Sequence, residues 1–510
     1  TSAAPDASAP GPHPNPPPKG EGVNESPWPR ADVVVGNPPF LGDKKMRREL
    51  GDAYVDALRA TYEGRVPGGA DLVCYWFEKS RAAIASQALT AAGLVATNVI
   101  ARGANRKVLD QIAQSTVIYE VWEDQEWVNE GAALRVSLIA FGLQNMPKLF
   151  NGAAVPKIST TLKPISGDPT ALDPADVHQL TENAEASFFG FCLAGDFKVS
   201  GCEAAGWLRQ PNVNGRPNSD VLKPIYNGRD VTTRWAGEWV IDFGTELSEL
   251  DAALYEAPFS HVLTHVAPVR ASNNRAARAR LWWRFGETRP GLRRELKDLP
   301  RYITTVETAK HRVFLFFPAS VAPEHSLIVI PRADDVTFGL MQSRFHDVWT
   351  MHFGSPYGNH PTARRYNATR TFGTFPFPAG LTPADTAHQR TEAIEGGALI
   401  PAGLPGDLKP NKPASRTQQA QAATQTIAIR DAASAIAQAA QRLDTLRRNW
   451  LNPPEWTLAV PEVVPLGMDH SPYPDRIEPR PNLSEADAKA LQKRTLTNLY
   501  NQRPAWLAQA

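Results

Sequence analysis

The chain has 510 residues, which predicts about three folded units at the usual ~100 to 200 residues per domain. Its 54 basic and 53 acidic residues nearly cancel, which excludes a polycation, so any nucleic-acid surface must be local. The three cysteines, Cys74, Cys192 and Cys202, show no C-x-x-C spacing and indicate neither a zinc site nor a disulfide framework. The sequence has no long apolar run and no secretory signal pattern, so we expect a cytoplasmic protein without a membrane partner.

The first part of the chain has an α/β pattern that follows a low-complexity start. Residues 1–26 mix Ala, Pro, Ser and Gly without periodicity, which is typical of a disordered tail. From residue 31 onward we expect strands at 31–36, 92–99, 117–122 and 133–142, and helices at 43–62, 71–90 and 106–114. This order predicts the second half of a doubly wound, Rossmann-like sheet over residues 27–150.

The rest of the chain changes pattern several times. Residues 151–186 are a polar connector, and the short strands, turns and aromatic residues of 187–380 predict a mixed α+β domain. A linker rich in Pro and Gly follows at 381–415. We expect a helical C-terminal region over 416–510, because the Ala- and Gln-rich stretch 416–450 favours one long helix.

The tetrapeptide Asn37-Pro38-Pro39-Phe40 is the most informative motif. It directly follows the apolar run Val33–Gly36, which is typical of a buried parallel strand, so Asn37 is expected at the strand tip where α/β sheets place their chemistry. Two prolines stiffen the loop and leave its carbonyls free to accept hydrogen bonds, and the Asn37 side-chain oxygen is a further acceptor. With the apolar face of Phe40, these groups suit a planar ring that carries an exocyclic amine, and adenine is the obvious candidate.

Two further Asn-Pro-Pro strings lack this strand-then-loop context. Residues 15–17 lie in the low-complexity tail, and residues 452–454 follow a predicted helix end, where proline commonly stops a helix. We interpret both as segments that interrupt or end local structure, so only Asn37 is expected to be catalytic.

The segment Val34–Phe40 resembles the (D/N/S)-P-P-(Y/F/W) motif of amino-group DNA methyltransferases, and an Asn first with a Phe last resembles their N6-adenine subclass. Other segments, spread over residues 27–510, resemble the large MmeI-like methyltransferases, which are bacterial restriction-modification or phage-defence proteins. These segments are Trp28-Pro29, Gly42–Arg48, Ala70–Phe77, Arg365–Phe372 and Thr374–Pro378.

The resemblance implies a specific reaction. A methyl group would pass from S-adenosylmethionine to an adenine flipped out of double-stranded DNA. Asn37 and the Pro38 carbonyl would accept hydrogen bonds from N6, Pro39 would set the loop, and Phe40 would stack on the base. Residues 187–380 would be the target-recognition domain.

The donor-binding half of such a domain is not recognisable in this sequence. A Gly-rich turn after a first strand normally cradles the donor, but low-complexity residues precede the motif, and Gly68-Gly69 and Gly396-Gly397 lack a strand-then-helix frame. The cofactor-binding residues are therefore unknown. We expect a fragment that is inactive alone, with an N-terminal half or a nuclease domain as a partner.

Local groups of basic residues are candidate DNA contacts, or else solvated helix faces. The candidates that follow the motif are Lys44, Lys45, Arg47 and Arg48. Between Arg270 and Arg312, twelve basic against four acidic residues give a net charge of +8, which indicates a phosphate-binding surface. The candidates to read base edges are Arg275, Arg278, Arg301, Arg344 and His346.

Three further residues are given structural roles. Asp71 is expected to cap the helix that it opens rather than to shape the pocket. Tyr366 and Arg370 are expected to stabilise a domain junction, and no metal site is expected.

Two alternative functions stay open. Without a donor loop the chain could bind DNA and transfer nothing. Related Asn-Pro-Pro-(Tyr/Phe) loops also methylate protein glutamine or RNA, although the aromatic and basic segment 188–377 argues against that alternative.

Overall fold

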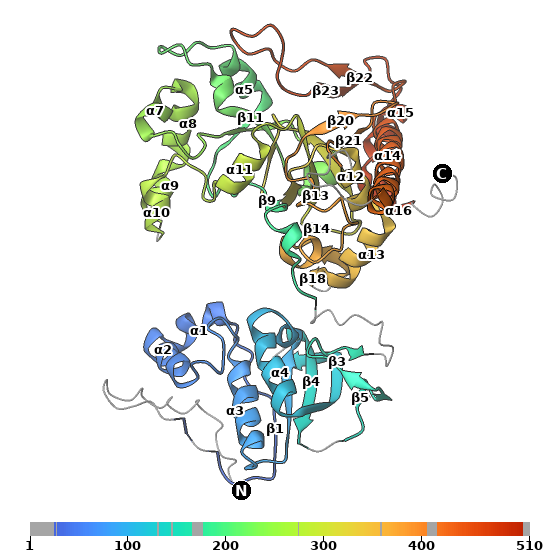
Figure 1. Cartoon of the computed structure of the whole chain (residues 1–510). Helices are drawn as coiled ribbons and strands as arrows, with labels where there is room; N and C mark the ends of the chain where they lie inside the picture. Colours follow the sequence, from blue (N-terminus) through green and yellow to red (C-terminus); the bar gives the residue numbers. More distant parts are fainter. Residues whose placement is uncertain are drawn as a thin grey trace. The chain divides into compact units, whose positions relative to one another are not determined.

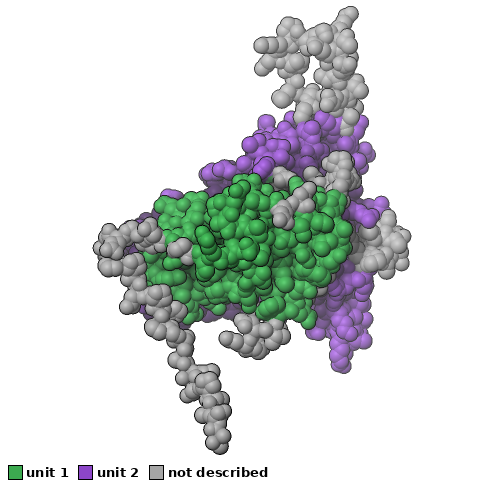
Figure 2. All heavy atoms as spheres, turned by 90° about the horizontal axis from the view of Figure 1, so that it is seen from below, with its two compact units in different colours: residues 1–177 green, residues 178–510 purple. Residues whose placement is uncertain are grey.

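The computed structural model describes residues 25–26, 28–129, 132–143, 146–165, 177–273, 275–357, 360–404 and 416–502. The chain forms two compact units, residues 1–177 (unit 1) and residues 178–510 (unit 2), shown in Figure 1 and coloured separately in Figure 2. Most of the expected disordered tail lies outside the described residues, as do parts of the expected connector and linker. No helix within the described ranges is both long enough and apolar enough to cross a bilayer.

Unit 1 is built on a six-stranded mixed sheet with the order β1-β2-β4-β3-β5-β6. The strands are β1 (Val33–Gly36), β2 (Ala91–Thr97), β3 (Val117–Asn129), β4 (Ala132–Gly142), β5 (Leu149–Phe150) and β6 (Ala153–Ala154). β1 and β2 run parallel, with Val33 opposite Ala91, whereas β4 is antiparallel to both β2 and β3. A small hairpin of β7 (Lys157–Ile158) and β8 (Pro164–Ile165) follows. The strands expected in this unit are therefore present.

Two helices, α3 (Val73–Ala85) and α4 (Gly103–Ser115), cover one face of this sheet. They are preceded in the chain by α1 (Asp43–Leu50) and α2 (Asp52–Thr61), and the short turn η1 (Asn98–Ala101) comes before α4. α3 and α4 lie side by side against the strands (Figure 1), and Phe77 of α3 stacks on Phe141 of β4 with 6.0 Å between ring centroids. The helix expected over 43–62 is divided at Gly51, whose φ of +83° is a left-handed conformation that favours glycine.

The edge strand β1 differs from the buried strand that the sequence predicts. It has a neighbouring strand on one side only, and its Val33 and Val35 are 53% and 86% exposed. Val34 points the other way and packs against the core. The expected burial is therefore wrong for one face of β1, because nothing among the described residues covers that face or pairs with that edge.

Unit 2 contains several smaller sheets. Their orders are β10-β12-β11-β16, β15-β13-β17-β9 and β14-β19-β18, with the hairpins β20-β21 and β22-β23. The strands are β9 (Phe188–Phe189), β10 (Lys198–Ser200), β11 (Leu222–Tyr226), β12 (Glu238–Ile241), β13 (Arg301–Val306), β14 (Thr308–Ala309), β15 (Phe314–Pro318), β16 (Ala322–Pro323), β17 (Leu327–Ile330), β18 (Ser355–Tyr357), β19 (His360–Arg365), β20 (Thr391–Ala393), β21 (Leu399–Pro401), β22 (Thr457–Val460) and β23 (Arg476–Pro479). The region is therefore mixed α/β, as expected.

The helices of unit 2 range from single turns to one very long helix. They are α5 (Gly201–Leu208), α6 (Gly228–Thr232), α7 (Glu249–Ala253), α8 (Glu256–His265), α9 (Ala267–Ala271), α10 (Ala276–Arg280), α11 (Pro290–Leu296), α12 (Asp335–Gln342), α13 (Arg344–Phe353), α14 (Arg416–Leu451), α15 (Glu485–Lys493) and α16 (Leu496–Asn501), with short turns at η2 (Thr181–Asn183), η3 (Asn218–Asp220) and η4 (Ala368–Phe372). The long helix expected at 416–450 is α14. Because the β22-β23 hairpin separates α14 from α15, the C-terminal region is not purely helical.

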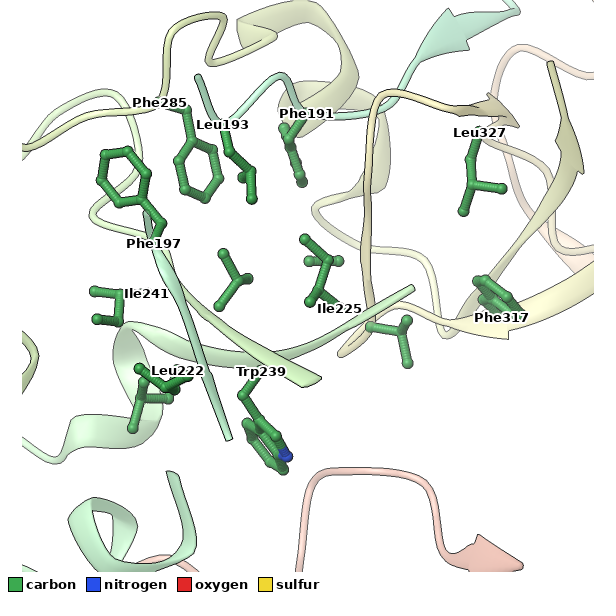
Figure 3. Packing of buried hydrophobic residues seen from close by; sticks show 14 of the residues in the cluster. Phe191, Leu193, Phe197, Leu222, Ile225, Trp239, Ile241, Phe285, Phe317 and Leu327 are labelled. Carbon is green, nitrogen blue, oxygen red and sulfur yellow. The ribbon is translucent and has the colours of Figure 1, made fainter. Parts of the chain in front are cut away.

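The main core of unit 2 joins residues that are distant in sequence. Its centre contains Phe197, Trp239 and Phe285 (Figure 3). Tyr473 packs edge-on against Trp239 with 4.6 Å between centroids, and its hydroxyl donates to the Leu222 carbonyl at 3.0 Å. The C-terminal segment is therefore part of this core.

Among the described residues of unit 2, four arginines are buried without forming an ion pair with a carboxylate. Arg270, Arg312, Arg332 and Arg447 are at most 7% exposed, and each guanidinium donates to backbone carbonyls. Fixed carbonyl dipoles thus replace the water that these charges lose on burial.

Candidate active site

The loop Asn37–Phe40 leaves the carboxyl end of β1 and leads into α1. Asn37 is exposed, Pro38 is buried and Phe40 is half-buried. The Asn37 carboxamide has no hydrogen-bond partner among the described residues, so its oxygen is available to a ligand. The Pro39 carbonyl is engaged, since it accepts from the Leu41 N–H at 3.2 Å, and the expectation that both proline carbonyls are free is corrected to Pro38 alone.

Asp71 holds the far end of this loop. Its Oδ1 accepts from the Asp43 N–H, the first residue of α1, at 2.9 Å, and the Leu72 N–H donates to the Leu41 carbonyl at 2.9 Å. The helix that Asp71 precedes, α3, begins after Leu72 without a side-chain cap. The expected cap is therefore wrong: the Asp71 carboxylate caps α1, which lies 28 residues earlier in the chain.

Asn105 is a site residue that the sequence did not single out. It lies in the first turn of α4, is 4% exposed, and its Nδ2 donates to Asp71 Oδ2 at 2.8 Å. In return, the Asp71 N–H donates to Asn105 Oδ1 at 2.8 Å. No local pattern links the two residues, because 34 positions separate them.

The basic residues after the loop fall into two pairs. Lys44 and Lys45 are exposed and form no ion pair within the described residues. Arg47 pairs with Asp52 and Asp56 of α2 at 2.9 and 2.7 Å, and Arg48 pairs with Glu49 at 2.6 Å. Because exposed ion pairs contribute little, a phosphate could replace these carboxylates, and all four residues stay predicted DNA contacts.

A complete donor site does not fit the described residues of unit 1. The loop after β1 is the proline loop, and the connection after β2 passes through η1 before it reaches Gly103 at the start of α4. Neither is a Gly-rich turn that joins a strand directly to a helix, which is the arrangement expected for S-adenosylmethionine.

Other chemistries have little support around this loop. Burial and the nearby Asp71 charge raise the pKa of the Cys74 thiol, so Cys74 is not a nucleophile at neutral pH. Among the described residues, no group of His, Cys, Asp and Glu side chains is arranged to hold a metal ion.

The basic segment Arg270–Arg312 is only partly a surface. Its two terminal arginines are the buried residues described above. Arg293 pairs with the buried Asp242 at 2.7 Å: burial alone would raise the pKa of Asp242, but the guanidinium holds it below its ordinary value. The surface charge is therefore lower than the sequence count of +8.

The individual base-reading candidates have different environments. Arg275 is exposed and Arg278 is half-buried, both at α10. Arg301 pairs with the buried Asp335 at 3.0 Å and lies 3.7 Å above the Phe316 ring, which are structural contacts. Arg344 is exposed at the start of α13, without an ion pair among the described residues.

The remaining recognition candidate, His346, and the predicted junction residue Tyr366 lie inside unit 2. His346 is fully buried, so a contact between this side chain and DNA is inconsistent with the structure. Burial lowers its pKa to about 3, and its Nδ1 bonds to the Met341 carbonyl at 3.0 Å. Tyr366 is also fully buried and bonds to His346 Nε2 at 3.3 Å, which places it within a core. The structure does not test its expected role at a domain junction.

Comparison with known proteins finds a family match that contains this loop. Residues 17–151 match the family of the MmeI DNA-methyltransferase domain. The type IIL restriction-modification enzyme MmeI, solved in complex with DNA, aligns with 68% of this chain and 46% of that protein, at 20% identity and a TM-score of 0.50. The type IIG restriction endonuclease BpuSI aligns with 68% of this chain and 47% of that protein, at 9% identity and a TM-score of 0.23, which carries no argument. No curated protein matches the sequence.

The two supported matches differ in extent. The family match contains the Asn37–Phe40 loop, and the aligned 68% of 510 residues exceeds the 177 residues of unit 1, so the likeness in fold to MmeI extends into unit 2. The chain spans less than half the length of that enzyme. The expected resemblance to MmeI-like methyltransferases is confirmed: residues 17–151, within unit 1, match the MmeI DNA-methyltransferase domain.

Proposed function

We propose that this protein takes part in site-specific N6-adenine methylation of double-stranded DNA, in a bacterial restriction-modification or phage-defence system. The observation that carries the proposal is the exposed and unpartnered Asn37 carboxamide at the tip of β1, within the matched methyltransferase domain. Unit 2 would recognise the DNA sequence, since the alignment with MmeI, which was solved in complex with DNA, reaches into this unit.

The loop would act on the adenine amine. The N6 lone pair is delocalised into the ring, which makes N6 a weak nucleophile. Two acceptors, Asn37 Oδ1 and the Pro38 carbonyl, would draw the amine toward tetrahedral geometry and restore its lone pair. Phe40 would stack on the extruded base and offset part of the few kcal/mol that flipping costs. S-adenosylmethionine supplies an activated methyl group when it is bound.

A second part of the enzyme would complete the donor site. A parallel strand with an unpaired edge and an apolar bare face is unusual, because parallel sheets are normally covered on both faces. Further strands beside β1 would bury Val33 and Val35, which are now 53% and 86% exposed. We propose that a donor-binding part supplied by a partner pairs with this edge.

The open edge also favours the second candidate, a DNA-binding protein that transfers nothing. Lys44 and Lys45 in unit 1, with Arg275, Arg278 and Arg344 in unit 2, would contact DNA in either case. Methylation of protein glutamine or RNA is disfavoured by the extent of the alignment with an enzyme solved on DNA.

Tritiated-methyl transfer separates these functions. The chain is assayed alone and together with a candidate donor-binding part, on genomic DNA that lacks methylated adenine. N6-methyladenine in the digested product supports the proposal, and N4-methylcytosine as the sole product would overturn the choice of base. DNA binding with no transfer in either assay supports the non-catalytic alternative.

A further inference from the structure

The loops that follow β1 and β2 are joined by one hydrogen-bonded cluster. The two strands run parallel, so their carboxyl ends lie at the same edge of the sheet. Asp71 lies between them: one carboxylate oxygen accepts from Asp43 N at 2.9 Å on the β1 side, and the other accepts from Asn105 Nδ2 at 2.8 Å on the β2 side. The cluster therefore ties the catalytic loop to α4.

Every polar group at the centre of this cluster has a partner. Asn105 uses both ends of its amide, donating to Asp71 Oδ2 and accepting from the Asp71 N–H at 2.8 Å. At 4% exposure, Asn105 has little access to water that could replace a lost bond. The position of one side chain is therefore coupled to that of the other.

We propose that Asp71 and Asn105 are positioning residues that hold the Asn37–Phe40 loop in its reactive geometry. This inference rests on the proposed methylation of adenine. β1 fixes the beginning of the loop, and the bonds to Leu41 and Asp43 fix its end, so two stiff prolines span a defined gap. Freeing the far end would move the amine acceptors relative to N6, and a misplacement of ~1 Å can lower a rate ~100-fold.

An exchange of the two side chains tests this coupling. Asp71→Asn places an NH2 group against either Asp43 N–H or the Asn105 amide, so two donors face each other. Asn105→Asp places two carboxylates in contact. In the double variant Asp71→Asn/Asn105→Asp, the new amide donates to the new carboxylate, which also accepts from the backbone N–H of residue 71. The double variant thus restores the three bonds that join residues 43, 71 and 105 with the original net charge, and loses only the long 3.5 Å contact from Asn105 Nδ2 to the Val99 carbonyl.

The first measurement is methyl transfer with the donor-binding part present. Each single variant is expected to lower kcat by about 10- to 100-fold with a DNA KM within a few-fold of wild type, and the double variant to recover most of kcat. The control Asp110→Asn, on the same helix as Asn105 but in a half-exposed pair with Arg106, should retain wild-type kcat. Single variants with wild-type kcat, or a folded double variant that shows no recovery, would overturn the proposal.

The second measurement needs no catalysis. Hydrogen exchange of the Leu41, Asp43 and Leu72 amides in the chain alone should be at least about 10-fold faster in both single variants, and return toward wild type in the double variant, while amides of unit 2 exchange as in wild type. Unaltered exchange of these three amides in the single variants would refute the positioning role even if the wild-type chain proves inactive. An inactive wild type with the expected exchange pattern would instead refute the proposed function, and the positioning role of Asp71 and Asn105 would still stand.

Discussion

Both units have an apolar core, but they depart from that pattern in different ways. In unit 1, the apolar Val35 is 86% exposed on an edge strand, whereas in unit 2 the charged Arg270 is 1% exposed and its guanidinium donates to three backbone carbonyls. A charge can be buried in unit 2 because backbone carbonyls of the same unit accept its hydrogen bonds and take the place of water. An open apolar strand has no such compensation, and in unit 1 the proposed donor-binding part would supply it.

The largest effect expected in unit 1 comes from Asn37→Ala. Removing one of two amine acceptors should lower methyl transfer by at least about 100-fold, comparable to the loss of one preorganised group at a transition state. Duplex binding should stay within a few-fold of wild type, as measured by fluorescence anisotropy. Near-normal methylation would remove Asn37 from the catalytic role.

The next effect tests whether β1 is an interface. Val35→Lys would bury a charge if further strands cover this face, so association with the donor-binding part should weaken at least about 10-fold by calorimetry. The control is Val213→Lys, a valine that is 93% exposed in unit 2 and should have no effect. Equal affinity for both variants would show that the bare face of β1 is not the contact.

Unit 2 should lose stability in acid through His346. Its folded pKa of about 3 is below the ordinary value of 6.5, so the unfolded chain binds the proton more tightly. The contribution is complete above pH ~6.5 and is lost as the pH falls toward ~3, by a few kcal/mol. Urea unfolding of wild type and His346→Asn at several pH values checks this, since the variant should flatten the pH dependence. An equal slope in both proteins would assign the acid effect to other groups.

The smallest effect concerns the exposed part of the basic segment. Replacing Arg275, Arg278 and Arg280 by Ala should weaken binding to all DNA and flatten the slope of log K against log[salt] by up to about 3, at ~0.9 per phosphate contact. If one of them reads a base, affinity for the specific site should instead fall by ~1 to 3 kcal/mol.

A matched control removes three positive charges elsewhere on unit 2. This variant replaces the exposed residues Arg442, Lys489 and Lys493 by Ala. If it changes the salt slope as much as the α10 variant does, the effect comes from net charge, and the segment is only a solvated surface.

The sequence predicted the elements of unit 1 well, because alternation and turn residues are local signals. From local signals it also predicted correctly that Asn37 follows a strand and that α14 is one long helix. It misjudged Asp71, since a carboxylate before a helix suggests a local cap, whereas its partners Asp43 and Asn105 are set by tertiary packing. The count of +8 overstated the surface charge for a similar reason, because a charge total contains no information about burial, and Arg312 is 7% exposed.

The long-range bonds of the unit 2 core have a consequence for the order of folding. Arg447 donates to Phe314, 133 positions away, and Tyr473 donates to Leu222 across 251 positions. Contacts of such sequence separation close large loops and slow folding. During synthesis, the core of unit 2 is complete only after α16 has emerged, because the Tyr500 hydroxyl of α16 accepts from Arg447. Until then the strands of unit 2 are incompletely covered, so we expect the chain to be most sensitive to aggregation during this period.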